Sequence, residues 1–276
     1  MTLLQSIVLG IIQGFTEFLP ISSSAHLVIA PYLLNWRIPA QEGFIFDVLV
    51  QLGTLLAVIV YFRRDLYRII LGVINGLIHK RPFSEPDARM GWLLVLATIP
   101  ALIAGLLFKD PVERAFGNPT AAALFLLVTA AFLVIAERLG KRTRQLLSIT
   151  WLDALIAGIF QAVSLLPGIS RSGSTITGGM LRDIDRPSAA RFSFLMSVPV
   201  MIGAGVIAVA DLLHIPSFSQ QIPTLIAGFI AAVVVGYLSI RWLLAYLVKR
   251  PLYLFAIYCL AVSITVLVFT LFRIRL

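Results

Sequence analysis

Two short polar segments contain most of the residue types in this chain that can do chemistry. The first runs Glu17-Phe18-Leu19-Pro20-Ile21-Ser22-Ser23-Ser24-Ala25-His26, and the second runs Pro167-Gly168-Ile169-Ser170-Arg171-Ser172-Gly173-Ser174-Thr175. The flanking sequence is apolar enough to lie in lipid, where a charged side chain at a helix centre costs about 2.5–3.5 kcal/mol. Opposite charges kept at that depth predict a functional site in which Glu17 and Arg171 pair or share a charged ligand.

Glu17 is the residue of the first segment with the widest choice of roles. Gln13 lies four residues earlier and therefore shares a helix face with it. A carboxylate at this place can bind Mg²⁺, act as a base, or pair with a buried cation. The hydroxyls of Ser22 to Ser24 follow a proline, where they either cap the next helix or help its free N–H groups to cradle a phosphate. His26 is a candidate proton donor or acceptor near neutral pH, or a packing residue.

The second segment has the composition of an anion-binding turn. It is rich in Gly, Ser and Thr and precedes a predicted helix, so its backbone N–H groups favour a negative ligand. Arg171 adds a planar, bidentate donor that matches phosphate oxygens. The other candidate phosphate-binding residues here are Ser170, Ser172, Ser174 and Thr175.

These groups together suit phosphoryl chemistry, in which catalysis is mostly positioning and charge stabilisation. Asp47 and Gln51, again four apart, either line the same cavity or face water at the outer end of a span. The sequence has no G-x-x-x-x-G-K-[ST] motif and no H-E-x-x-H motif, and its three histidines argue against a multi-histidine metal site. The alternative hypothesis is a transporter that binds a lipid phosphate or another anion at the same place.

The composition predicts an integral membrane protein. Of 276 residues, 59% are hydrophobic and 13% are charged, and the mean hydropathy is +0.98, whereas soluble proteins carry about 25% charged residues. The net charge of +9 does not indicate nucleic-acid binding, because the basic residues fall between apolar runs, where they set membrane topology. With Cys259 as its single cysteine, the chain forms no intrachain disulfide.

The apolar runs predict six membrane-spanning helices and two broken segments. The broken segments, 2–34 and 151–181, are interrupted midway by Pro, Gly and Ser, and we expect both to be re-entrant helical hairpins. The alternative for 2–34 is one kinked spanning helix. Residues 66–79 are predicted to form either an interfacial helix or a loop helix packed on the bundle. The predicted spans are 44–62, 90–108, 119–137, 192–211, 222–247 and 252–272.

The two halves of the chain resemble each other at a fixed offset of 148 residues. Gly10-Ile11-Ile12-Gln13 matches Gly158-Ile159-Phe160-Gln161, and Phe44-x-Phe46 matches Phe192-x-Phe194. Each half is a broken hairpin followed by three spans, and an odd number of spans per repeat forces inverted topology. We therefore predict an all-α integral membrane protein, a single domain over 1–276, made of two inverted repeats at about 1–138 and 149–276.

The basic residues orient this topology. With the loop after residue 62 in the cytoplasm, sixteen Lys and Arg residues fall on the cytoplasmic side and five on the outer side, namely Arg37, Lys109, Arg114, Arg273 and Arg275. The first hairpin then enters from outside and the second from inside. Their tips are expected to meet near the midplane, which brings Glu17 and His26 close to Arg171.

At these residues the sequence resembles the bacterial undecaprenyl-diphosphatase family, also called bacitracin-resistance proteins. The segments that carry the resemblance are Gln13-Gly14-Phe15-Thr16-Glu17 with its continuation through His26, Pro167 to Thr175, and Phe46-Asp47-Val48-Leu49-Val50-Gln51-Leu52-Gly53. The resemblance extends over essentially the whole chain. It implies hydrolysis of undecaprenyl diphosphate to undecaprenyl phosphate and inorganic phosphate, which recycles the lipid carrier for cell-wall synthesis and confers bacitracin resistance.

The resemblance also implies a divalent cation, Mg²⁺ or Ca²⁺, a homodimer, and a multi-pass protein of the bacterial plasma membrane whose site opens to the outer side. Family members have Glu or Gln at the position of Gln13, so this chain has one carboxylate fewer than some relatives. Glu17 and Asp47 are the candidate metal ligands. Ser23 is the candidate nucleophile, with His26 or Glu17 as its base, and direct attack by water is the alternative.

Overall fold

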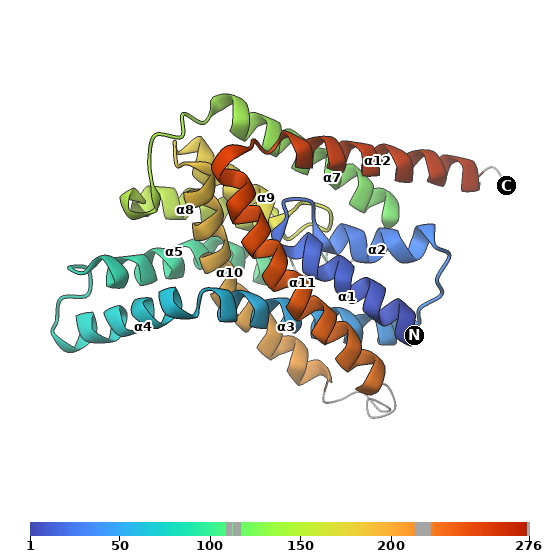
Figure 1. Cartoon of the computed structure of the whole chain (residues 1–276), viewed down its shortest axis with the longest axis horizontal. Helices are drawn as coiled ribbons and strands as arrows, with labels where there is room; N and C mark the ends of the chain where they lie inside the picture. Colours follow the sequence, from blue (N-terminus) through green and yellow to red (C-terminus); the bar gives the residue numbers. More distant parts are fainter. Residues whose placement is uncertain (109–111, 113–116, 213–221, 275–276) are drawn as a thin grey trace.

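A computed structural model describes residues 1–108, 112, 117–212 and 222–274, and the described part of the chain is helical, without a β-strand. It contains eleven α-helices and one short 3₁₀ helix, Leu146–Ser148 (Figure 1). The α-helices are α1 Leu3–Phe18, α2 Ser23–Leu33, α3 Ala40–Tyr61, α4 Arg63–Ile78, α5 Pro86–Leu107, α7 Pro119–Leu139, α8 Trp151–Val163, α9 Arg171–Leu181, α10 Arg186–Leu212, α11 Ile222–Lys249 and α12 Tyr253–Ile274.

The six predicted spans are confirmed as long apolar helices, so the chain is a multi-pass membrane protein. Helices α3, α5, α7, α10, α11 and α12 each contain an apolar stretch of 20 to 28 residues, enough to cross a bilayer. The largest difference is that α10 begins at Arg186, six residues before the predicted span, because polar residues there continue the same helix. Lys109, Arg114 and Arg275 of the predicted outer side lie outside the described residues, and the side chain of Arg273 also lies outside them.

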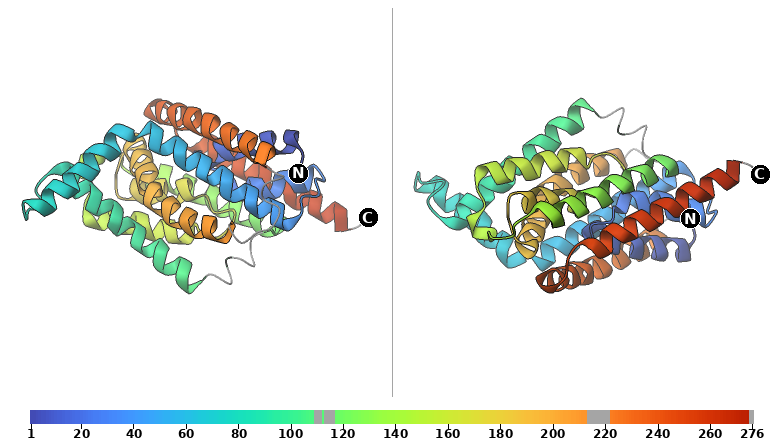
Figure 2. Two further views of the ribbon diagram at one scale, coloured as in Figure 1. Left: turned by 90° about the horizontal axis from the view of Figure 1, so that it is seen from below. Right: turned by 90° about the horizontal axis from the view of Figure 1, so that it is seen from above.

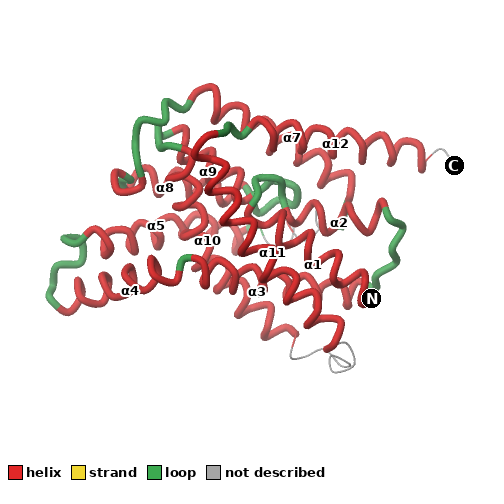
Figure 3. Tube along the Cα trace, in the orientation of Figure 1, coloured by secondary structure: helices red, strands yellow, loops and turns green. Residues whose placement is uncertain are grey.

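Both predicted breaks are present, and each separates two helices too short to cross a bilayer. Pro20 ends α1, because proline lacks an amide hydrogen and forces the preceding residue into extended backbone, here Leu19 at φ −64° and ψ 142°. Helices α1 and α2 then pack on each other, and the chain turns back between them (Figure 1). In the second break, Gly168 has φ +106°, a left-handed conformation that glycine adopts without strain. The tube in Figure 3 shows the loops of the chain that join these helices.

Glycines let α1 pack closely against α11, and this contact fixes where the first break lies in the helix bundle. A Cβ atom at Gly10 would lie 2.3 Å from the backbone oxygen of Gly228, and one at Gly14 would lie 2.8 Å from the amide of Gly236. Small residues at a helix interface let membrane helices pack backbone to backbone. Because Gln13 and Glu17 follow on the same helix, this contact holds their side chains in place.

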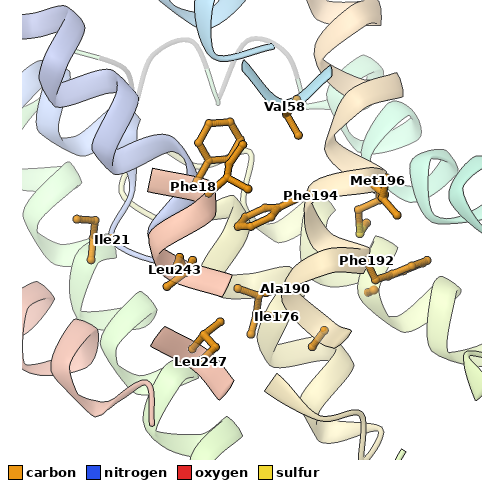
Figure 4. Packing of buried hydrophobic residues seen from close by; sticks show 14 of the residues in the cluster. Phe18, Ile21, Val58, Ile176, Ala190, Phe192, Phe194, Met196, Leu243 and Leu247 are labelled. Carbon is orange, nitrogen blue, oxygen red and sulfur yellow. The ribbon is translucent and has the colours of Figure 1, made fainter. Parts of the chain in front are cut away.

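The hydrophobic core packs around the end of α1. The buried ring of Phe18 meets Phe194 of α10 edge to face, with 5.4 Å between ring centroids, and Figure 4 shows Leu243 of α11 close to both. Aromatic pairs of this kind stabilise a core beyond their buried area. The core therefore fixes the residue next to Glu17 from two other helices.

Helix α4, Arg63–Ile78, contains all but the last residue of segment 66–79, where the sequence predicts either an interfacial helix or a loop helix packed on the bundle. It packs on α5, since a Cβ atom at Gly72 would lie 2.8 Å from the amide of Ala88. The opposite face remains apolar and exposed, with Ile70 and Ile74 at 56% and 45% exposure. The described structure thus bears out packing on the bundle, and the exposed face keeps the amphipathic character of an interfacial helix.

A buried ion cluster anchors both ends of the α8–α9 segment. Asp153, in the first turn of α8, accepts hydrogen bonds from Arg144 at 2.6 Å and from Arg182, just after α9, at 2.8 Å. The hydrogen bonds to Asp153 raise the pKa of the Arg144 guanidinium above its ordinary value, which keeps this pair ionised. Because the two helix ends are tied together, the break between them is held against the rest of the bundle.

Candidate active site

Glu17 is the centre of a buried hydrogen-bond network at the point where the two breaks meet. Its Oε1 atom accepts from Nη2 of Arg171 at 2.9 Å, and its Oε2 atom accepts from Oγ of Ser23 at 2.6 Å. Oε2 also accepts from Nε2 of Gln13 at 2.9 Å. The expected proximity of Glu17 and Arg171, which are 154 residues apart in sequence, is therefore confirmed.

Arg171 uses only part of its donor capacity on Glu17. Its other terminal nitrogen, Nη1, is buried and has no hydrogen-bond partner among the described residues. A buried guanidinium nitrogen without an acceptor carries a desolvation cost, which a bound anion would remove. Because Arg171 also lines a cavity, the free nitrogen identifies a place for a negatively charged ligand.

The cavity has a volume of about 290 Å³ and is lined by both polar and apolar residues. Its polar residues come from both breaks and from the helices around them. The lining includes Gln13, Thr16, Glu17, Ser22, Ser23, Ser24, Asp47, Gln51, Gln161, Ser164, Ser170 and Arg171, with Leu27, Val28, Leu165, Val200 and Met201 among its apolar members. Such a lining suits a ligand with one anionic end and one apolar end.

Two serine caps place helix N-termini at this cavity. The Ser22 side chain accepts from the amide of Ala25 at the start of α2, and the Ser170 side chain accepts from the amide of Gly173 at the start of α9. Capping satisfies one of the four amides that an α-helix leaves free at its start. The remaining first-turn amides and the helix dipoles favour an anion between the two breaks.

The two breaks are held to each other and to α7 by hydrogen bonds. Oγ of Ser172 donates to the carbonyl of Leu19 at 3.0 Å, and the amide of Gly168 donates to Oγ of Ser24 at 3.3 Å. On α7, the Thr129 hydroxyl accepts from the amide of Ser170 and donates to the carbonyl of Gly168. These contacts fix the backbone on which the chemically active side chains stand.

Four predicted site residues lie outside the cavity lining, and His26 is the most informative of them. Its Nδ1 atom lies 2.7 Å from the carbonyl oxygen of Ser22, and its Nε2 atom lies 2.8 Å from the hydroxyl of Tyr258 on α12. Both ring nitrogens are therefore occupied, and the acceptor of the Ser23 hydroxyl hydrogen is Glu17. In this geometry His26 supports the left-handed backbone of Ser22, which has φ 70°.

Ser172, Ser174 and Thr175 are the other three. They are buried in the interior of the bundle rather than along the cavity. The Thr175 hydroxyl pairs with Ser193 at 2.6 Å, and Oγ of Ser174 has no partner among the described residues. The structure thus brings Gln13, Glu17, Ser22–Ser24, Asp47, Ser170 and Arg171 to one cavity, while the hydroxyls of Ser172 and Thr175 bind neighbouring segments of the bundle.

Several site residues were not identified from sequence. Thr54 receives a 3.4 Å hydrogen bond from Gln13, while Gln161 and Ser164 line the cavity from α8 and its end. Gln161 lies 148 residues after Gln13, so the internal sequence match could have identified it as the counterpart of Gln13. Thr54 and Ser164 look like ordinary polar residues near helix packing sites, and no sequence pattern singles them out.

Oxygen atoms suited to a divalent cation are present at this cavity. No group of three or more His, Cys, Asp or Glu residues with metal-binding geometry occurs in the described part of the chain. Mg²⁺, however, needs only one or two carboxylates when phosphate oxygens complete its shell. Glu17 and Asp47 both line the cavity, and the buried Oε1 atom of Gln13 has no partner among the described residues. The donor set therefore fits a hard cation that a phosphate ligand shares.

Comparison with known protein families shows which family the chain belongs to. Residues 6–265 match the model of the family described as bacitracin resistance protein BacA. The chain belongs to the BacA family. That match covers both breaks, the first five spans and the first part of the sixth, so the site described above lies within the part of the sequence that defines the family.

Curated relatives of the BacA family match the chain over nearly its full length. A protein named undecaprenyl-diphosphatase from Chloroherpeton thalassium is 42% identical over 275 residues, which covers 97% of this chain and 96% of the relative. A protein of the same name from Moorella thermoacetica is 44% identical over 275 residues, covering 99% of this chain and 100% of the relative. The undecaprenyl-diphosphatase of Chlorobaculum tepidum is 42% identical over 276 residues, with 97% of each chain covered.

Proposed function

We propose that the protein is an undecaprenyl-diphosphatase, which hydrolyses undecaprenyl diphosphate to undecaprenyl phosphate and inorganic phosphate. The name of its full-length relatives supports this activity. The main structural support for the proposal is that Glu17 forms hydrogen bonds with both Ser23 and Arg171. This contact identifies the residues that would act on the substrate. The cavity around it has polar lining residues that suit a diphosphate and apolar lining residues that suit the first part of a prenyl chain.

Arg171 is the proposed diphosphate clamp. Arg171 lines the cavity, and its Nη1 atom is buried without a partner among the described residues, so this nitrogen is free to bind a phosphoryl oxygen. The first-turn amides of α2 and α9 add hydrogen-bond donors that are already oriented. Preorganised donors of this kind stabilise the charge that develops in phosphoryl transfer without reorganisation at the moment of reaction.

Ser23 is the proposed nucleophile and Glu17 its base. The Ser23 hydroxyl already donates to Glu17 at 2.6 Å, within the distance expected for general base catalysis. Attack of Oγ on the terminal phosphorus forms a phosphoserine, transfers the hydroxyl proton to Glu17, and breaks the anhydride bond with its electron pair on the departing undecaprenyl phosphate. Water then hydrolyses the phosphoserine and restores Ser23. Direct attack by water with Glu17 as base is the alternative.

A divalent cation, Mg²⁺ or Ca²⁺, would be held by Glu17 and Asp47, with Oε1 of Gln13 as a third oxygen. When bound, it would neutralise negative charge on the phosphate oxygens. Asp47 and Gln13 would help to orient the phosphate end of the substrate in the cavity that Arg171 also lines. His26 keeps a positioning role in this proposal, because its nitrogens bind Ser22 and Tyr258.

The finer architecture is also part of the proposal. We propose that α1–α2 and α8–α9 are re-entrant hairpins of two inverted repeats, supported by the matching residues at the 148-residue offset and by helices of 16, 11, 13 and 11 residues. The excess of basic residues on one side supports the proposed orientation of the spans. The family resemblance supports a cavity that opens to the outer face of the bacterial plasma membrane. A homodimer is proposed from the family resemblance alone.

The test is release of inorganic phosphate from undecaprenyl diphosphate by the purified protein in detergent, with and without EDTA. Metal-dependent release that is lost on Glu17→Gln substitution is the expected result. Hydrolysis needs no second compartment, whereas transport does. Folded protein that releases no phosphate but moves a lipid phosphate across liposomes would replace the enzyme with the transporter hypothesis.

A further inference from the structure

A second polar pocket lies at one end of the helix bundle. It is separate from the cavity lined by Glu17, Ser23 and Arg171, which we call the catalytic cavity. It has a volume of about 370 Å³ and lies where α3 joins α4, between α10 and α11. The left view of Figure 2 shows an end of α11 beside the α3–α4 junction. We call it the Arg191–Arg241 pocket, and its lining includes Tyr61, Phe62, Asp65, Arg191, Tyr237 and Arg241, none of which lines the catalytic cavity.

The pocket carries an excess of positive charge. Arg191 lies over the ring of Phe62, with its Cζ atom 6.0 Å from the ring centroid, and reaches Asp65 only at 3.4 Å. Asp65 is bound more closely, at 2.9 Å, by the exposed Arg68 outside the pocket. The Nε atom of Arg191 is buried without a hydrogen-bond partner among the described residues. Asp65 thus neutralises Arg191 only in part, and a donor of Arg191 stays free.

Arg241 and two tyrosines complete the donor set. Arg241 is exposed and forms no salt bridge with any described carboxylate. The rings of Tyr61 and Tyr237 meet at 5.4 Å between centroids, and the described residues offer neither hydroxyl a hydrogen-bond partner. Two guanidinium groups beside two hydroxyls present planar and single donors to one anionic group, the arrangement that suits phosphate oxygens.

The surroundings of the pocket are those of a membrane surface. Next to the polar lining on α3 and α11 are exposed apolar side chains, including Val60, Val234 and Leu238 at 40%, 52% and 54% exposure. Trp242, half exposed, follows Arg241 directly. Tryptophan and arginine beside an apolar surface mark the level of the lipid headgroups. A ligand held here would therefore have an anionic group in the pocket and apolar chains along α3 and α11.

We propose that the Arg191–Arg241 pocket binds the headgroup of an anionic phospholipid. The phosphate diester lies between Arg191 and Arg241, and the acyl chains cover the exposed apolar residues of α3 and α11. Basic pockets between membrane helices bind anionic headgroups in this way. The site is a lipid site rather than a second substrate site, because it lies outside the cavity that holds Glu17, Ser23 and the free nitrogen of Arg171.

The test compares lipid retention by native mass spectrometry of purified wild-type protein and two variants. Arg241→Gln removes a cation of the pocket that has no described partner, so the variant should fold. Lys249→Gln removes an exposed cation from the last turn of the same helix, outside the lining, and is the matched control. Phosphatidylglycerol and phosphatidylcholine are added to each protein in turn, and inorganic phosphate is added as a competitor.

We expect Arg241→Gln to retain about fivefold less phosphatidylglycerol than wild type, the effect of losing one cation near a headgroup, with Lys249→Gln and phosphatidylcholine binding unchanged. Equal phosphatidylglycerol retention by wild type and Arg241→Gln would overturn the proposal. Complete displacement of phosphatidylglycerol by millimolar inorganic phosphate would also overturn it, because the pocket would then be a site for a soluble anion.

Discussion

Replacing Arg171 separates its observed pairing with Glu17 from its proposed binding of phosphate. In the native protein Nη2 pairs with Glu17 at 2.9 Å, and Nη1 is buried at the cavity without a described partner. Arg171→Ala leaves Glu17 buried and without its cation, which costs about 3–5 kcal/mol of stability. Arg171→Lys keeps a positive charge near Glu17, so most of that stability should return.

Lysine cannot serve Glu17 and a phosphate oxygen with two separate nitrogens in fixed geometry. Losing one preorganised donor at a site of developing charge lowers kcat by about 10²–10³, or roughly 2.7–4 kcal/mol. We therefore expect Arg171→Lys to melt close to wild type but to hydrolyse undecaprenyl diphosphate about 10²–10³ times more slowly, whereas Arg171→Ala should be both unstable and inactive.

The assay is phosphate release at saturating substrate, with the thermal midpoint of the same detergent-solubilised samples. Arg68→Lys is the control, because Arg68 is exposed and pairs with Asp65 outside the catalytic cavity; it should match wild type in both measurements. If Arg171→Lys hydrolysed substrate within about tenfold of the wild-type rate, Arg171 would act only by neutralising Glu17, and its role as a phosphate clamp would be wrong.

Three further predictions concern Ser23, Asp47 and Asp153. Ser23→Ala should abolish phosphate release while Ser239→Ala, which removes a buried hydroxyl outside the cavity lining, should retain it; activity of Ser23→Ala within tenfold of wild type would favour water as the nucleophile. Asp47→Asn should raise the Mg²⁺ concentration needed for half-maximal activity, measured by titration after EDTA treatment, and an unchanged requirement would remove Asp47 from the proposed ligands. Asp153→Asn should lower stability by about 1–3 kcal/mol, because two partly exposed arginines lose their carboxylate acceptor; an unchanged thermal midpoint would contradict that anchoring role.

The spans and breaks were predictable from sequence because they depend on local properties. Six apolar runs long enough to cross a bilayer became six helices. Pro20 follows the end of α1, and the Pro167-Gly168 pair lies in the break between α8 and α9, since proline removes a helical hydrogen bond whatever its neighbours are. Charges inside apolar sequence also identified Glu17 and Arg171 before their contact was known.

The assignment of individual polar residues depended on neighbours that are distant in sequence. His26 was a reasonable base for Ser23 by spacing, yet its ring binds Tyr258, 232 residues away. Ser172 belonged to the predicted phosphate-binding turn, but its hydroxyl donates to Leu19 across the interface between the breaks. On a short helix, adjacent serines point in different directions, and only packing decides which of them faces the cavity.

The sequence by itself determined that this is a membrane protein with two polar breaks and a carboxylate, hydroxyls and an arginine at their tips. Hydrophobic length, helix-breaking residues and buried charge act locally, so they can be read without a structure. Only the tertiary structure decided that Glu17 binds Ser23 and Arg171 together, that Nη1 of Arg171 stays free, and that His26 faces α12. Those facts depend on the relative placement of helices from both halves of the chain, which no local pattern specifies.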